Sequence, residues 1–462
     1  MLHADSMFQK RTEPWIIAVI LTALLPLFPE YIAPFLGIGA LIAAYRDAKK
    51  RRQLFTVGPL GKIMLVYLLF LSVGILYSRN ALSAFSAWLM WGVMLTVYVT
   101  LHTVLTSRER VDIALFALST SAGCVGAIAC IQYVLRTVFG FSGYLQLWHP
   151  LDVLVYRLSP LPVNMEVVGD RACATFNNPN IMAEYLIMAI PFIALYAFNG
   201  GRTKARLFSR GCLVLAVCGV SFSFARGSYL ALLAIAAVFA IANIRRIALA
   251  FLAAFSALAL TPPAVFDRLF SISRVKKSVP SSMTDPAAAA HLIAAAGADK
   301  AISERFQVWQ ACLQSFFDHP LLGIGAGVGN TNSMLLAHSL NVPHAHNVVL
   351  QLLVEGGIVG LGIFAVAGLK ALQTSVRLTR KPGPSRTVGI AALAFLAGFG
   401  VNSMVEFPFF TPKLIGVFLL ALALFDSAGR LYLEQPASPL ADVLVPPLRQ
   451  RSADHVTVAR MK

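Results

Sequence analysis

Charged residues are scarce in this chain. Only 13% of its 462 residues are charged, whereas 58% are hydrophobic and the mean hydropathy is +0.72. A soluble domain typically has an apolar share of about 45–50%. The shortage of charge therefore excludes an ordinary soluble domain, and the sequence indicates an all-α polytopic membrane protein.

Acidic residues are scarcer than basic ones, at 21 against 38, and the formal net charge is +17. Such an excess can signal nucleic-acid binding, but here the cations lie in short clusters between apolar runs. That pattern is how membrane proteins encode their orientation. We therefore expect membrane lipids around the protein and no nucleic-acid partner.

Continuous apolar runs predict about twelve membrane spans. They lie at 15–28, 31–45, 60–77, 82–105, 111–139, 181–198, 211–224, 229–243, 247–260, 348–376, 388–405 and 414–433. The chain thus divides into an N-terminal bundle of about nine spans (1–262), a long loop (263–345), about three further spans (346–434) and a tail (435–462).

Lys and Arg collect on every second loop, at 46–52, 108–110, 202–210, 245–246 and 377–386. Loops that stay in the cytoplasm collect these residues. We therefore expect both termini, the tail included, in the cytoplasm. The long loop then lies on the far side of the membrane.

This topology leaves several cations on the far side, against the insertion bias. They are Arg79, Arg157, Arg171, Arg226, Lys413 and, on the long loop, Arg268, Arg274, Lys276, Lys277, Lys300 and Arg305. Snorkelling to lipid head groups explains any single one. Together they indicate a receptor for a polyanion, because Arg binds phosphate through a planar fork. Arg226 lies in a connection so short that it stays near bilayer depth, where a cation is a functional hypothesis by default.

His346-Asn347 stands where the long loop re-enters the apolar run 348–376. Histidine is the side chain best suited to taking a proton near neutral pH, so His346 is a candidate general base for a hydroxyl at the lipid interface. Capping of the following helix is the alternative. Asn180, before the sixth span, likewise either caps a helix or binds sugar hydroxyls.

Ligands for a metal are few. On the far side no Asp-x-Asp or Glu-x-Asp pair is present to hold a divalent ion beside a pyrophosphate. His344 and His346 form a potential metal pair, but no adjacent carboxylate or cysteine completes the set. We expect no metal and no cofactor. A bridge between Cys173 and Cys312 stays open and unsupported.

Two patterns organise the long loop. Apolar residues at helical spacing predict an amphipathic helix over 302–316 that lies on the membrane surface or on the bundle. Every second residue of 323–329 is glycine, so the backbone can come close to another group there. Plain turn formation is the alternative.

In this order and on this topology, the motifs resemble the O-antigen ligase and polymerase superfamily. The resemblance covers roughly 171–360. It rests on Arg171 with Phe176-Asn177-Asn178-Pro179-Asn180, Arg226-Gly227, Glu304-Arg305 with Trp309, Gly323-Ile324-Gly325, and above all His346-Asn347 with Gly357 and Gly360.

The resemblance implies a GT-C-like glycosyltransferase of the bacterial inner membrane. Such enzymes move a glycan from undecaprenyl pyrophosphate to an acceptor at the periplasmic face, without a metal or a nucleotide sugar. Ligases transfer to lipid A-core, polymerases lengthen the glycan, and protein O-oligosaccharyltransferases use Ser or Thr. The last group usually has a larger C-terminal periplasmic region, whereas this chain has only a short basic tail after its twelfth predicted span. We therefore expect a ligase, acting as a monomer. A transporter for an anionic lipid is the alternative from another class.

The resemblance also assigns roles. His346 is the general base, while Arg226 and Arg305 stabilise the departing pyrophosphate in an inverting displacement. Glu406, near the outer end of the eleventh span, is placed to orient a sugar or the histidine. By topology alone, and not by the resemblance, Arg79, Arg171 and Lys413 are candidates for substrate binding; Asn180, Asn347 and Glu406 complete the candidate set.

Overall fold

The computed structural model describes residues 13–141, 171–201, 203–242 and 300–434, together with Trp148 and Leu151. Within these residues the regular structure is helical, without a strand. Eight of the described helices are long and apolar enough to span a membrane, and two shorter apolar helices accompany them. The predicted all-α polytopic membrane fold is confirmed.

A helix overlaps each predicted span in the described residues, but the helix at 31–45 is not among those that are long and apolar enough to span a membrane. The first group is α2 (Pro14–Leu24), α3 (Ala33–Lys50), α4 (Pro59–Tyr77), α5 (Ala81–Val104) and α6 (Arg108–Thr137). The second group is α8 (Pro179–Asn199), α9 (Thr203–Phe222) and α10 (Arg226–Ile241). The third is α14 (Lys300–Asp318), α15 (Val328–Ala337), α16 (Val348–Arg380), α17 (Pro384–Ser403) and α18 (Pro412–Gly429). The span predicted at 247–260 and the tail at 435–462 lie outside the described residues.

Helices α8 and α18 form the centre of the bundle. Nearly all of their side chains are buried, as expected for helices that are apolar on every face. The surrounding helices expose large apolar side chains instead, such as Phe35 and Leu69. Exposed apolar surface of this kind suits contact with lipid acyl chains.

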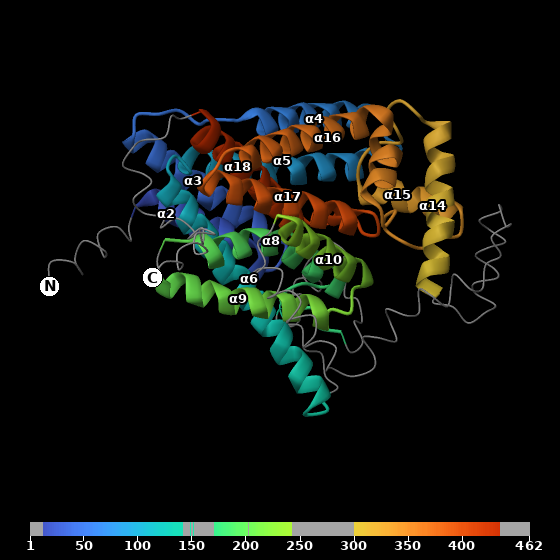
Figure 1. The fold of residues 1–462 in the computed structure, drawn as a ribbon. Coiled ribbons are helices and arrows are strands. Elements are labelled where there is room, and N and C mark those ends of the chain that lie inside the picture. The colour runs from blue at the N-terminus through green and yellow to red at the C-terminus, as the bar shows by residue number, and fades with distance from the viewer. Residues whose placement is uncertain are drawn as a thin grey trace, which may run out of the picture.

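Basic loops at 46–52, 108–110 and 377–386 meet at one end of the bundle. Arg51 after α3 donates to the Thr103 carbonyl at 2.9 Å, and Arg430 after α18 donates to the Leu105 carbonyl at 2.7 Å. The C-terminal ends of α3, α5 and α18 therefore meet. Figure 1 shows α14 and α15 beyond the other end of the bundle, with α14 running across it. Which end faces the cytoplasm stays a prediction.

The amphipathic helix of the long loop is confirmed as α14, and it packs on the protein. Its buried face, which includes Val308 and Cys312, forms a small apolar cluster with Leu335 of α15 and Val354 of α16. The glycine run that follows α14 lies against the turn between α4 and α5. A Cβ atom on Gly325 would lie 2.6 Å from the Ser78 Cβ atom. The predicted close backbone approach is thus confirmed, and its partner is this turn.

Helix α16 is broken at Gly357, which has φ of +57°. The break frees backbone groups that pair with the segment after α14: the Ile358 amide donates to the Pro320 carbonyl at 2.9 Å, and the Ile324 amide donates to the Val354 carbonyl at 2.8 Å. A Cβ atom on Gly357 would overlap the Leu321 carbonyl. The first glycine of the motif therefore lets the long loop dock on α16.

Replacing Gly357 by alanine tests this docking. We expect Gly357→Ala to lower the free energy of unfolding by at least about 2 kcal/mol, because it places a side chain on a residue with a left-handed backbone and creates a steric overlap. Gly362→Ala, in the same helix, is the control, since a Cβ atom there meets nothing within 4 Å. Thermal unfolding in detergent measures both. Equal melting temperatures for the two variants would contradict the docking.

Candidate active site

His346 has a left-handed backbone, with φ of +50°. Histidine is one of the few non-glycine residues enriched in this region, but the conformation still costs about 1–3 kcal/mol. Helix α16 begins at Val348, and its N-cap is Asn347, whose side chain accepts from the Leu350 amide at 3.1 Å. The capping role considered for His346 thus belongs to Asn347. The Asn347 amide also donates to the Met404 carbonyl at 3.0 Å, which ties this helix start to the end of α17.

The His346 ring pairs with Glu406, which follows α17. Its Nδ1 lies 3.0 Å from Glu406 Oε2, and the His346 side chain is 24% exposed. With Nδ1 held by a carboxylate, the second ring nitrogen is the one that can exchange a proton with a ligand. Nε2 has no hydrogen-bond partner within the part of the chain that the structure describes. The pair therefore has the arrangement of an oriented general base.

Two further donors share the Glu406 carboxylate. Arg305 of α14 lies 2.7 Å from Oε1, and the side-chain Nδ2 of Asn180 in α8 donates to the same oxygen at 2.8 Å. Burial acts to raise the pKa of Glu406, but the hydrogen bond from His346 and the charges of His346 and Arg305 outweigh it, so the pKa lies below its ordinary value. Glu406 is thus an ionised, buried hub that joins three helices.

Arg171 extends the cluster toward Arg226. Its guanidinium donates to the Asn180 side chain and to the Ser223 carbonyl, the latter at 2.7 Å. Arg226 begins α10 three residues further along. Beside it, a Cβ atom on Gly227 would overlap the Val405 side chain, so only glycine lets this turn pack against the residue before Glu406. The Arg-Gly motif is thus positioned next to the cluster.

The Asn180 side chain does not cap α8. The helix begins at Pro179 with Asn178 as its N-cap, whose side chain accepts from the Asn180 amide at 2.7 Å. The Asn180 side chain instead bridges Arg171 and Glu406. The side chain of Asn180 is therefore not the cap of α8, and its binding of sugar hydroxyls stays a prediction.

Two of the predicted site residues lie elsewhere in the fold. Lys413 is 1% exposed; its ammonium donates to the Thr175 carbonyl at 2.8 Å and lies 4.5 Å from the centre of the Phe176 ring. This burial favours a structural role that anchors the turn before α8. Arg79 is exposed in the turn between α4 and α5, next to Asn80. Direct contact of either residue with substrate stays a prediction.

Two buried residues behind Glu406 were missed at the level of sequence. Glu184 of α8 is 3% exposed and hydrogen-bonds to the Asn402 side chain. Asn402 Oδ1 also accepts from Ser228 at 3.0 Å, and its carbonyl accepts from the Glu406 amide at 3.1 Å. Asn402 thereby connects the Arg226 turn to Glu406. A lone glutamate inside an apolar run is the signal that could have identified Glu184 as a candidate.

Metal-ligand and disulfide chemistry find little support. The His344 and His346 rings lie 4.3 Å apart, but within the described ranges no group of three or more His, Cys, Asp or Glu could hold a metal ion. Cys173 and Cys312 are both buried, and neither is part of a disulfide. The bridge between them that the sequence left open is therefore not formed.

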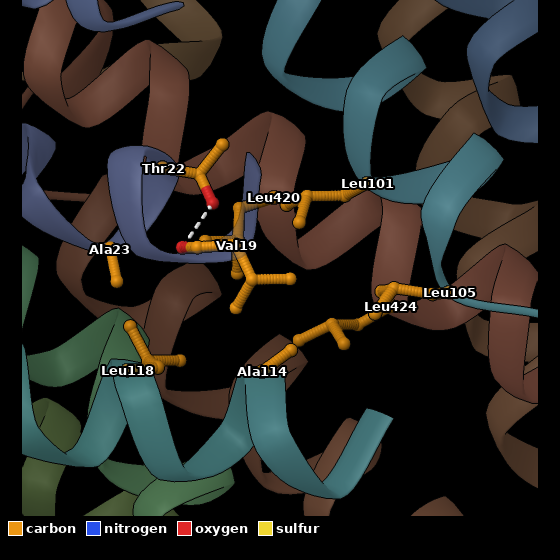
Figure 2. Close-up of a pocket in the computed structure, with 9 residues that line it drawn as sticks. All are labelled: Val19, Thr22, Ala23, Leu101, Leu105, Ala114, Leu118, Leu420 and Leu424. Carbon is orange, nitrogen blue, oxygen red and sulfur yellow. Dashed lines mark hydrogen bonds between the residues drawn. The ribbon is translucent and has the colours of Figure 1, made fainter. Parts of the chain in front are cut away.

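A small cavity lies away from this cluster, between α2, α5, α6 and α18 (Figure 2). Its one polar lining group is Thr22, whose hydroxyl donates to the Val19 carbonyl at 2.8 Å. The other lining residues are Val, Ala and Leu. With no polar group left to bind a substrate, the cavity is a gap in apolar packing.

The comparison with known families agrees with this geometry. Residues 211–365 match the family described as O-Antigen ligase, and this stretch contains Arg226, Arg305 and His346. No curated protein matches the chain. Members of this family are membrane enzymes of the glycosyltransferase type that act on lipid-linked glycans, and the described helices of this chain agree with a multi-pass membrane protein. Residues 211–365 are thus similar to the O-antigen ligase family, in agreement with the motifs.

The Glu406 hub predicts a pH-dependent stability difference. Because its pKa is depressed in the folded protein, Glu406 stabilises the fold above its unfolded pKa of about 4.3, and this contribution is lost as the pH falls through the folded pKa. We expect Glu406→Gln to cost about 1–3 kcal/mol at pH 7. The difference from wild type should shrink below about pH 4.3.

Thermal unfolding in detergent across this pH range measures the difference. Asp318→Asn is the matched control, because Asp318 is exposed at the end of α14. A difference that stays constant down to pH 3, or an equal loss in the Asp318 variant at pH 7, would show that the Glu406 charge does not hold the cluster together.

Proposed function

We propose that this protein is an O-antigen ligase of the bacterial inner membrane. It transfers the glycan from undecaprenyl pyrophosphate to lipid A-core at the periplasmic face, with both termini and the basic loops in the cytoplasm. The observation that carries the proposal is the convergence of His346, Arg305 and the Arg171–Asn180 arm on Glu406. This cluster lies within and beside the matched family domain.

In this proposal His346 is the general base. Its Nδ1–H donates to Glu406, so Nε2 takes the proton from the acceptor hydroxyl as the oxygen attacks the anomeric carbon. The ionised Glu406 stabilises the imidazolium that forms. The bond from the anomeric carbon to the pyrophosphate oxygen breaks, and its electron pair leaves with the pyrophosphate. A single displacement of this kind inverts the anomeric configuration.

Arg305 and Arg226 stabilise the departing diphosphate. A guanidinium has five N–H donors in a fork that matches phosphate oxygens. Glu406 engages Nη2 of Arg305, which leaves further donors on the same side chain. Arg171 and Asn180 bind phosphate or glycan oxygens at the edge of the cluster. Charge supplied by guanidinium groups makes this a metal-independent site.

Replacing the proposed base is the first test. Purified His346→Ala, supplied with lipid-linked glycan and lipid A-core in the presence of a chelator, should lose transfer by at least about 100-fold. His338→Ala, an exposed histidine after α15, should transfer normally. Glycosylated core identifies a ligase, whereas longer lipid-linked chains identify a polymerase and modified protein an oligosaccharyltransferase. Normal transfer by His346→Ala would end the assignment of the base.

A charge-conserving change tests the arginine fork. Arg305→Lys keeps a cation but loses the planar, two-pronged geometry, so we expect kcat/KM to fall by about 100-fold. Arg377→Lys is the control, because Arg377 lies in the last turn of α16, far along the helix from His346; this variant should keep the wild-type kcat/KM. The same transfer assay measures both variants. A wild-type rate for Arg305→Lys would mean that a point charge suffices and that no fork contacts the diphosphate.

A further inference from the structure

Both peptide groups on the N-terminal side of His346 are held by side chains. The Ala345 amide donates to Gln351 Oε1 at 2.7 Å, and Trp309 Nε1 donates to the Ala345 carbonyl at 3.0 Å. The His346 amide donates to His344 Nδ1 at 3.2 Å. These groups come from α14, α16 and the loop between them, so the short segment is fixed from three directions.

Such fixing matters because the His346 backbone is left-handed. A non-glycine residue persists in that conformation only where its surroundings over-determine it. Gln351 cannot turn away, since it is 1% exposed and its amide donates to Thr331 at 2.8 Å and to Glu355 at 2.9 Å. The direction in which the His346 ring leaves the backbone is therefore set by its neighbours.

The position of the His344 side chain suits it to hold the segment before His346 and not to contact a substrate. It is 8% exposed, with its ring centre 5.8 Å from that of Phe407 and 5.1 Å from that of Phe410. Burial, aided by the charges of His346 and Arg305, lowers the pKa of His344 to about 3. The ring is therefore neutral near pH 7. Because Nδ1 accepts a hydrogen bond, the ring carries its proton on Nε2.

We propose that His344 and Trp309 are positioning residues, which fix the peptide groups before His346 so that its ring meets Glu406 and its Nε2 faces the acceptor hydroxyl. This inference rests on the proposed role of His346 as general base. Neither side chain touches the reacting atoms. Their loss should therefore lower kcat and leave the KM for the lipid-linked donor unchanged.

Three substitutions at His344 separate positioning from simple packing. His344→Asn places an amide oxygen near the position of Nδ1, so it still accepts from the His346 amide. His344→Gln reaches toward the position of Nε2 instead, and His344→Phe fills the space without an acceptor. We expect the Asn variant to stay within about threefold of the wild-type kcat. The Gln and Phe variants should lose about 10- to 100-fold.

The melting temperature and the size-exclusion profile of each variant show whether it is folded. If the Phe variant does not fold, Trp309→Phe tests the same segment, because it keeps a ring and removes only the donor to the Ala345 carbonyl. We expect a lower kcat with the same KM. An Asn variant as slow as the Gln variant, or an unchanged kcat for Trp309→Phe, would overturn the inference.

The proposed function fails in a different way. Wild-type protein without transfer, or full transfer by His346→Ala, would remove the base itself. Full transfer by the folded Phe variant beside an inactive His346→Ala would remove only the positioning role of His344. The two failures are therefore distinguishable in one set of assays.

Discussion

The ionised carboxylate of Glu406 is the interaction on which the candidate site depends. It is 8% exposed, and an uncompensated charge at that depth is strongly unfavourable. Arg305, His346 and Asn180 compensate it from α14, from the start of α16 and from α8. Removing a partner from such a buried pair costs more than the pair contributes, because the remaining charge is left without compensation. The carboxylate therefore determines where three helices must meet.

Close backbone packing makes this meeting possible. Gly325 lies against the turn between α4 and α5, and Gly357 receives the segment that follows α14. Gly227 lets the turn that begins α10 pack against Val405. At each place a side chain would push a candidate site element away from the hub. The glycines of the motifs thus act on the geometry of the protein itself, and the chemistry is left to His346 and the arginines.

The sequence predicts the fold better than it predicts the details of the site. Apolar runs and loop charge are long-range averages, so they place the helices well. Single polar residues are ambiguous. The sequence predicts Lys413 and Arg305 alike as far-side cations, but in the structure Lys413 is buried beneath the turn before α8. Caps also escape prediction, since Asn178 and Asn347 fill roles considered for their neighbours. His344 was considered only as a metal ligand, and Gln351 and Asn402 were missed, because only tertiary contacts reveal their present roles.

An arginine-based site must exist before its anionic ligand arrives. Arg305 and Arg171 would repel each other across a shared space, and Glu406 offsets this repulsion directly for one and through Asn180 for the other. The same carboxylate orients His346, so one charge prepares both halves of the proposed reaction. Groups aligned in advance avoid the cost of reorganisation during the chemical step. The price is a strained His346 backbone, which the contacts around Ala345 maintain.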